Sequence, residues 1–220
     1  LDTTRSKHGY ESILGSFESG KTQILVGTQM VTKGLDFDHV SLVGIFDADR
    51  MMHFPDFRSH ERAFQLMTQV SGRAGRRDRP GKVVIQTNDP KHTLFQWVER
   101  HDVLGFLNHQ LKDREQNFYP PFSRLIAIEL RHADKKIVHQ AALALGNELR
   151  RTLHNLRLLG PAEPMIGKIR NEFRMGLLLK IRRDQGQLAI IKQELQKAGD
   201  QLHTQKEFRN VRVVFDVDPN

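Results

Sequence analysis

Cysteine is absent from all 220 residues. Neither a disulfide nor a cysteine-ligated metal site can therefore form. Long apolar runs are absent too. The longest strictly apolar stretches have about five residues, as at 141–145, far short of the ~18 that a membrane-spanning helix needs. The chain opens on Leu1 and charged residues, with neither an initiator methionine nor a signal-peptide core. We therefore expect a soluble fragment or processed chain without a membrane partner.

Acidic residues are fewer than basic residues. Lys and Arg number 34 against 26 Asp and Glu, a formal net charge of +8, and the isoelectric point is about 9.9. A basic surface suits nucleic acid, although acidic proteins and anionic lipids also bind such surfaces. With 38% hydrophobic residues, the chain is not expected to be disordered throughout, and its length allows one large domain or two small ones.

The first half of the sequence alternates short apolar runs with helical patterns, which predicts an α/β fold with a parallel sheet. Ser59 is a candidate N-cap for a helix whose apolar side includes Ala63, Phe64, Met67 and Val70. The expected strands are residues 24–26, 40–46 and 83–85, and the expected helices are residues 10–17, 59–70 and 93–112.

A domain boundary is predicted at the Y-P-P-F segment, residues 119–122, because proline cannot continue a helix. The two expected domains are residues 1–118 and 119–220. The second half then follows a β-α-β-β-α-β order, which predicts a ferredoxin-like antiparallel sheet with both helices on one face. Its expected strands are residues 125–131, 156–164, 173–181 and 211–217, and its expected helices are residues 137–153 and 188–202.

Residues 15–22 match the phosphate-loop pattern G-x-x-x-x-G-K-T letter for letter. That loop works between a strand that enters it and a helix that leaves it. Here the expected order is reversed, since a helical pattern comes first and residues 24–26 are expected to be the strand. We therefore interpret Gly20 as a glycine that ends a helix, and we reject the nucleotide site.

A more informative segment is Q-V-S-G-R-A-G-R-R at residues 69–77, at the end of the expected helix. Arg73 and Arg76 are three residues apart, so they share one face of a helix or turn. Guanidinium groups presented in this way can neutralise a transferring phosphoryl group, and Gln69 could orient water or phosphate. Taken alone, the segment is more often a solvated basic turn, because charge runs usually face water.

A second polar segment, residues 26–37, follows the first expected strand. Open α/β sheets bind ligands at the carboxyl ends of their strands. Thr28, Gln29 and Lys33 offer donors for a phosphate backbone, and Asp36 offers an acceptor for ribose hydroxyls or for an arginine finger.

Together, and in this order, the two segments resemble motifs V and VI of superfamily 2 helicases. Further phrases extend the match: P-D-F-R at 55–58, Y-P-P-F at 119–122, G-P-A at 160–162 and D-V-D-P at 216–219. With them, the sequence resembles the primosomal protein N′ family, the PriA replication-restart helicases, over essentially its whole length.

The resemblance implies an ATP-dependent 3′-to-5′ DNA helicase of the bacterial cytoplasm that recognises stalled replication forks and promotes primosome assembly. The implied partners are forked and single-stranded DNA, the single-stranded-DNA-binding protein and primosome proteins. Residues 1–118 would be a second RecA-like lobe, incomplete at its N-terminus, and residues 119–220 the C-terminal domain.

The resemblance also implies roles for individual residues. Arg73, Arg76 and Gln69 would be catalytic. Gly34, Asp36 and Gly72 would line the nucleotide site, and Thr28, Gln29 and Lys33 would hold DNA.

The first lobe of the family has no counterpart here, and it would complete the site for ATP and Mg²⁺. We expect this chain alone to be inactive as an ATPase, because arginine fingers need a bound phosphate to act on. The family's zinc module is expected only upstream of this sequence, so no metal site is predicted. Residues such as His53, His60 and His92 are interpreted as ordinary surface histidines.

Two other interpretations stay open: a non-catalytic module that binds nucleic acid and protein, or a part of another superfamily 2 DNA translocase. Arg58 and Glu61 could pair as a helix-start ion pair or contact DNA. In the second domain, basic residues gather around one expected strand, and they could contact DNA or form a solvated sheet edge. Phe173 offers an aromatic face there for packing or base stacking. These basic residues are Lys168, Arg170, Arg174, Lys180, Arg182 and Arg183.

Overall fold

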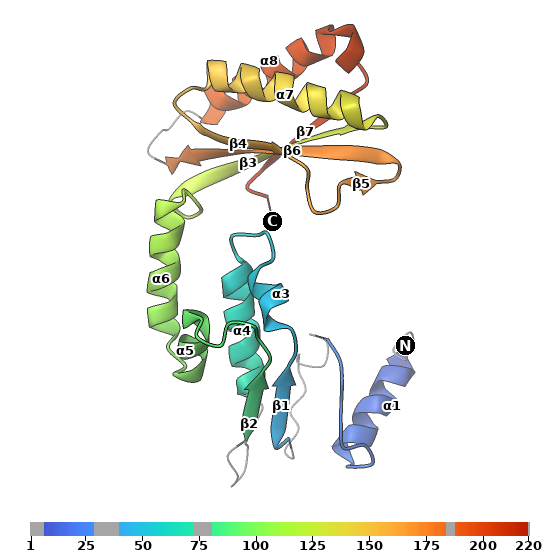
Figure 1. Ribbon diagram of the computed structural model, residues 1–220, viewed down its shortest axis with the longest axis vertical. Helices are drawn as coiled ribbons and strands as arrows, with labels where there is room; N and C mark the ends of the chain where they lie inside the picture. Colours follow the sequence, from blue (N-terminus) through green and yellow to red (C-terminus); the bar gives the residue numbers. More distant parts are fainter. Residues whose placement is uncertain (1–6, 29–39, 73–80, 184–187, 220) are drawn as a thin grey trace. The chain divides into compact units, whose positions relative to one another are not determined.

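The computed structural model describes residues 7–28, 40–72, 81–183 and 188–219 (Figure 1). The chain divides into two compact units, Leu1–Gln110 and Leu111–Asn220. No helix among the described residues is long and apolar enough to cross a bilayer. Each unit has its own hydrophobic core, and each is described separately below.

The first unit begins with α1 (Lys7–Glu18), the helix expected from the apolar spacing. Gly20 ends it in the left-handed region, with φ of 73°, and its amide donates to the carbonyl of Phe17 at 3.0 Å. This confirms that a helix enters the apparent phosphate loop. The expected strand at residues 24–26 is wrong, because these residues are not in a strand and Ile24 and Val26 are about 80% exposed. Apolar residues alone do not make a strand without a neighbouring backbone to bond.

Two parallel strands form the described sheet of this unit, β1 (Leu42–Ile45) and β2 (Lys82–Ile85). Between them lie α3 (Ala48–Met52) and α4 (Ser59–Ser71). The expected apolar side of α4 is confirmed, since Ala63, Phe64, Met67 and Val70 are buried.

The start of α4 differs from the expectation. The N-cap is Arg58, which makes no side-chain cap bond, and Ser59 is the first helical residue. Asp56 organises the turn before the helix instead, because its carboxylate accepts from the amide of Arg58 at 2.9 Å and its carbonyl accepts from the amide of Ser59. Arg62 completes this turn with an ion pair to Asp56 at 2.7 Å.

The single helix expected over residues 93–112 is two helices, α5 (Thr93–Glu99) and α6 (Val103–Gln116). His101 separates them because its φ is 51°, a left-handed value at which a helix cannot continue. The carboxylate of Asp102 then accepts from the amide of Gly105 at 2.8 Å and starts the second helix. Phe106 of α6 stacks on Phe64 with centroids 4.1 Å apart, which closes the core of the first unit.

The second unit has the predicted β-α-β-β-α-β order. Its strands form an antiparallel sheet in the order β4-β6-β3-β7, the ferredoxin-like arrangement. One additional short strand, β5, pairs with β6 and was not expected from the sequence. The elements are β3 (Ser123–His132), α7 (Lys135–Thr152), β4 (Arg157–Ala162), β5 (Lys168–Ile169), β6 (Glu172–Arg182), α8 (Leu188–Thr204), the short 3-10 helix η2 (Lys206–Phe208) and β7 (Arg212–Val217).

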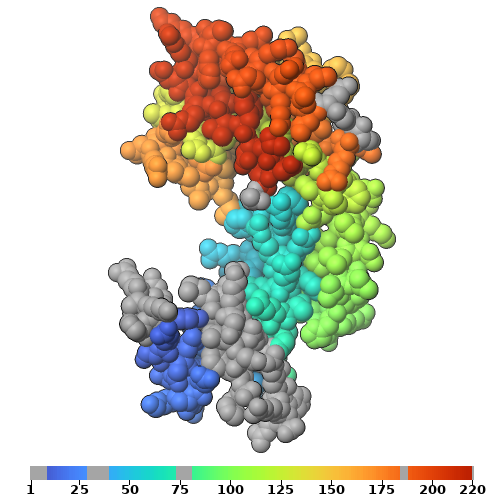
Figure 2. Space-filling model, turned by 180° about the vertical axis from the view of Figure 1, so that it is seen from behind, coloured from blue at the N-terminus to red at the C-terminus, as the bar shows by residue number. Residues whose placement is uncertain are grey.

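Both long helices of this unit, α7 and α8, cover the same face of the sheet (Figure 1). The core between them uses alternate residues of the two central strands, such as Ile126, Leu130 and Leu179, each 0% exposed. The space-filling view shows the outer surface of this unit, coloured from yellow-green to red (Figure 2). Because side chains alternate along a strand, the intervening residues of β3 and β6 lie on the face without helices.

Candidate functional site

Three of the nine residues predicted for the helicase site are among the described residues. Gln69 lies on the exposed side of α4, two residues before its end, and Gly72 is the C-cap of that helix. Thr28 is exposed. The other six, Gln29, Lys33, Gly34, Asp36, Arg73 and Arg76, lie outside the described residues, so their roles stay predictions.

The surroundings of Gly72 do not require glycine. Its φ is −67°, an ordinary helical value, and a β-carbon built there would meet the carbonyl oxygen of Thr68 at 3.6 Å. The residues just before Thr28 are not in a strand, so the expectation that it stands at the end of a parallel strand is wrong for the described residues.

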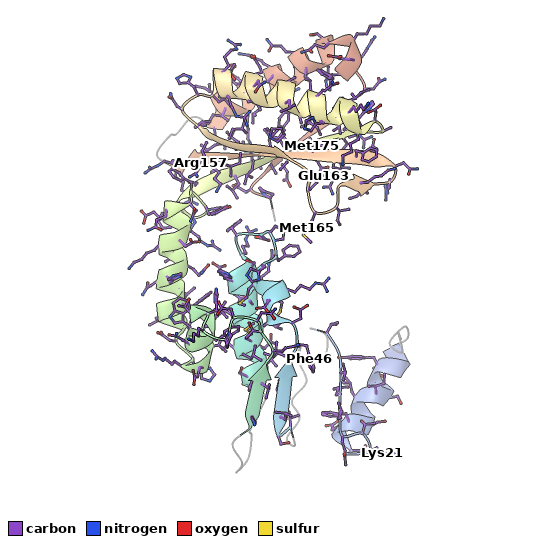
Figure 3. The ribbon with its side chains drawn as sticks, in the orientation of Figure 1. Lys21, Phe46, Arg157, Glu163, Met165 and Met175 are labelled. Atoms are coloured by element: carbon purple, nitrogen blue, oxygen red, sulfur yellow. The ribbon has the colours of Figure 1, made fainter. Side chains whose placement is uncertain are left out.

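The loops that follow β1 and β2 are tied together by Asp49, a residue that the sequence did not single out. Its carboxylate accepts from the hydroxyl of Thr87 at 2.7 Å and from the amide of Asn88 at 2.8 Å. These hydrogen bonds, the one from Thr87 foremost, hold the pKa of Asp49 below its ordinary value. The carboxyl ends of both strands are thereby fixed, with Phe46 exposed beside them (Figure 3).

The histidines considered above have structural contacts. The imidazole of His92 accepts from the amide of Leu94 at 3.2 Å and caps α5, and the rings of His60 and His92 meet edge to face at 5.4 Å. His53 bonds to the carbonyl of Asp49 at 2.9 Å. Within the described residues, no group of three or more potential ligands could hold a metal ion.

The basic strand predicted for the second unit is β6, and it lies between β4 and β3. The interpretation as a sheet edge is therefore wrong. At one end of this strand the charge is neutralised, because Arg174 and Arg131 both bond to the carboxylate of Glu129 on β3. Burial opposes ionisation of Glu129, but hydrogen bonds from Arg174 and then Arg131 hold its pKa below the usual range.

Phe173 and Lys168 belong to this same end of β6. The ammonium of Lys168 stands 4.7 Å from the centre of the Phe173 ring, and Phe173 packs against the hydrophobic core. Arg170 forms the hairpin turn between β5 and β6 with a φ of 47°. These residues hold the hairpin together, so packing accounts for Phe173.

The other end of β6 carries a different environment. Lys180 is only 5% exposed. Its ammonium donates to the carbonyl of Asn117 at 2.7 Å and stands 3.4 Å from the centre of the Tyr119 ring. Burial, followed by repulsion from Arg157, lowers the pKa of Lys180 to about 8. No carboxylate of the described residues pairs with it, which makes this end of the strand strongly cationic.

Sequence reasoning assigned the Y-P-P-F segment to a domain boundary and missed that its aromatic rings face these cations. Phe118, just before the segment, has the guanidinium groups of Arg157 and Arg182 at 5.3 Å and 5.7 Å from its ring centre. The signal available in the sequence was the combination of three aromatic residues at 118–122 with a basic strand. Figure 3 labels Arg157 at this end of the sheet.

The described fold is an α/β unit with a parallel sheet, followed by a ferredoxin-like domain. Comparison with known families agrees. Residues 1–78 match the helicase conserved C-terminal domain, and residues 115–220 match the primosomal protein N C-terminal domain.

Individual relatives are named replication restart protein PriA. That of Bacillus subtilis (strain 168) is 37% identical over 100% of this chain and 27% of its own length. The relative from Synechocystis is 42% identical over 81% of this chain and 22% of its own length. The relative from Chlamydia pneumoniae is 38% identical over 81% of this chain and 24% of its own length. The chain belongs to the PriA replication restart family and spans about a quarter of the length of these relatives.

Proposed function

We propose that the chain is the C-terminal part of an ATP-dependent 3′-to-5′ DNA helicase that recognises stalled replication forks and promotes primosome assembly. The observation that carries this proposal is the order of the two matched domains, a helicase C-terminal domain and then a primosomal C-terminal domain. Its implied partners are forked and single-stranded DNA, the single-stranded-DNA-binding protein and other primosome proteins.

In this proposal the end of α4 faces the nucleotide. The side chain of Gln69 is exposed there and α4 ends at Ser71 in an ordinary helical turn, which supports a ligand site at this end of the helix. Arg73 and Arg76 neutralise charge on the terminal phosphate, and Gly34, Asp36 and Gly72 line the site. ATP and Mg²⁺ supply the phosphoryl group and its charge neutralisation when they are bound with a first helicase lobe.

DNA is held in the first unit by Thr28, Gln29 and Lys33. Thr28 is exposed, as a contact to a phosphate backbone requires. Arginine fingers contact a triphosphate more closely than a diphosphate, so nucleotide turnover biases closure of the two lobes and moves the strand contacts along DNA.

The test is reconstitution. The 220-residue chain is mixed with a separately expressed first lobe of the same parent protein, and DNA-stimulated ATP hydrolysis is measured. We expect neither part alone to hydrolyse ATP and the mixture to do so. Arg76→Ala should lower the restored rate by roughly 10³-fold, the usual contribution of an arginine finger. Arg151→Ala, which removes an exposed arginine from α7, should leave the rate unchanged.

Two outcomes contradict the proposal. If the chain alone turns over ATP, the assignment of the nucleotide site to two lobes is wrong. If the mixture is inactive although the chain binds DNA, the chain is a non-catalytic binding module instead. The cationic and aromatic end of β6 is the observation that favours this second candidate.

A further inference from the structure

A pocket of about 410 Å³ opens at the cationic end of β6, within the second unit. This volume falls in the range of roughly 300–1,000 Å³ that small ligands occupy. Its walls combine aromatic rings with guanidinium groups, and they come from the loop after α6, the start of β3 and the end of β6. The residues that matter are Glu115, Phe118, Phe122, Ser123, Arg182 and Arg183.

The aromatic wall is held in place by its own loop. Phe118 has a φ of 58°, a backbone conformation that is a genuine outlier for a bulky residue. The loop around it is fixed because Arg114 donates to the carbonyl of Pro120 at 2.8 Å and accepts, at its own carbonyl, from the amide of Tyr119 at 2.8 Å. The ring of Phe118 is therefore positioned before any ligand arrives.

The charge of this end of the sheet favours an anion. Arg182 and Arg183 line the pocket, and Arg157 stands over Phe118 beside them. Among the described residues that line the pocket, Glu115 is the one carboxylate. With Lys180 at the neighbouring position, a negatively charged group would be stabilised here by several cations at once.

Two features favour a nucleotide over an acidic peptide. Aromatic rings and Pro121 form flat apolar walls, which suit an unpaired base because any base can stack on an aromatic face. Ser123 lines the pocket and is 2% exposed, and its hydroxyl has no hydrogen-bond partner among the described residues; a nucleotide offers both donors and acceptors for such a group.

We propose that this pocket binds an unpaired nucleotide of single-stranded DNA, with its base against Phe118 and Phe122 and its phosphate toward Arg182 and Arg183. The inference rests on the proposed function in one respect, that the parent protein works on DNA. It adds a strand contact in the second unit that is separate from Thr28, Gln29 and Lys33.

The first test is a binding titration of the 220-residue chain with a fluorescently labelled oligothymidine, followed by anisotropy at several salt concentrations. Phe118→Leu keeps an apolar side chain but removes the ring, and it should weaken binding at least about fivefold. Arg182→Ala should weaken binding and lower the salt slope by about 0.7. Arg151→Ala is the matched control, since it removes an equal charge from α7, and it should bind like the wild type.

The second test needs no variant. Oligothymidine carrying 5-iodouracil is crosslinked to the wild-type chain by light, and the tryptic peptides are sequenced by mass spectrometry. Trypsin releases residues 115–124 as one peptide, because Arg114 and Arg124 flank it. We expect the crosslink on this peptide, at Phe118 or Phe122.

The possible results separate this inference from the proposed function. If DNA binds but the crosslink maps elsewhere and both variants bind like the wild type, the pocket is not a DNA site and the proposed function stands. If the chain binds no DNA at low salt, the inference fails together with the DNA contacts of the proposed function. If polyglutamate displaces DNA and Phe118→Leu has no effect, the pocket takes an acidic peptide and the inference is wrong.

Discussion

Lys180 provides a measurable link between the structure and pH. Its ammonium is buried on β6 against Tyr119 and the carbonyl of Asn117, and Arg157 repels it from β4. Burial, followed by the repulsion from Arg157, lowers its pKa from 10.5 to about 8. In the unfolded chain the same lysine titrates at its ordinary value. Between pH 8 and 10.5 the unfolded state therefore binds more protons at this position than the folded state does.

The sign and size of the effect follow from linkage. Stability rises with pH wherever the unfolded state binds more protons. Below about pH 8, the pKa of Lys180 in the folded chain, the free-energy cost of keeping its buried ammonium charged is present in full. This cost declines as the pH rises toward 10.5, the pKa of the unfolded chain's lysine. With ~1.4 kcal/mol for each pH unit of difference, the free energy of unfolding should gain about 2 kcal/mol between pH 7 and pH 9.5 from Lys180.

The assay compares the wild type with Lys180→Met, which keeps the apolar stem and removes the titrating group. Urea unfolding is followed by far-UV circular dichroism at several pH values, and the fluorescence of Trp97, the single tryptophan, reports separately on the first unit. We expect the stability of the wild-type second unit to rise relative to Lys180→Met as pH increases. Lys197→Met, a change at a 67% exposed side chain, should give no such difference. Parallel pH profiles for the wild type and Lys180→Met would refute the reasoning.

Two further changes test how the second unit is built. Asp134→Ala removes a carboxylate that accepts from two backbone amides in the first turn of α7, and it should lower stability in urea by about 1 kcal/mol; an unchanged midpoint would contradict this cap. Gly160→Ala should cost about 2 kcal/mol or more, because φ is 90° there and a β-carbon would lie 2.7 Å from the carbonyl oxygen of Gly176. Gly15→Ala, where nothing lies within 4 Å, is the control and should not destabilise α1.

The second unit was predictable in outline because each of its long elements has a clear apolar period. The stripe along α7 and the alternation along β3 both come from one-sided burial, and the structure confirms them. The short strand β5 has two residues, both exposed, so it leaves no period to detect. Its pairing depends on a hairpin with left-handed residues at Arg170 and Asn171, which the pattern of apolar residues does not specify.

The errors in the first unit have local causes. Residues 24–26 are apolar like a buried strand, but a strand is completed only by hydrogen bonds to a neighbour, and the sequence does not show which neighbour is present. Residues 93–112 have a helical period throughout, yet His101 adopts a left-handed conformation and Asp102 starts a new helix. Asp134 stands directly before α7 and caps it with its carboxylate, as an N-cap aspartate does. Asp56 lies three residues before α4 and organises the preceding turn, which the N-cap rule does not predict.

The candidate site, too, was predictable only where its residues lie close together in the sequence. The arginine and glutamine motifs are recognisable from local spacing alone. Phe118 and Arg157 meet only because β4, β6 and the loop after α6 come together in space. Contacts of this kind join residues about forty positions apart and leave no local pattern in the sequence.

Glu129 gives the open face of the second unit a polarity along its central strand. It neutralises the guanidinium groups at one end of β6, whereas at the opposite end the buried Lys180 has no carboxylate partner among the described residues and is repelled by Arg157. An incoming polyanion is therefore attracted to one end of this strand and not pulled equally toward both. A surface with such a difference in charge between its two ends can orient a bound anionic chain as well as hold it.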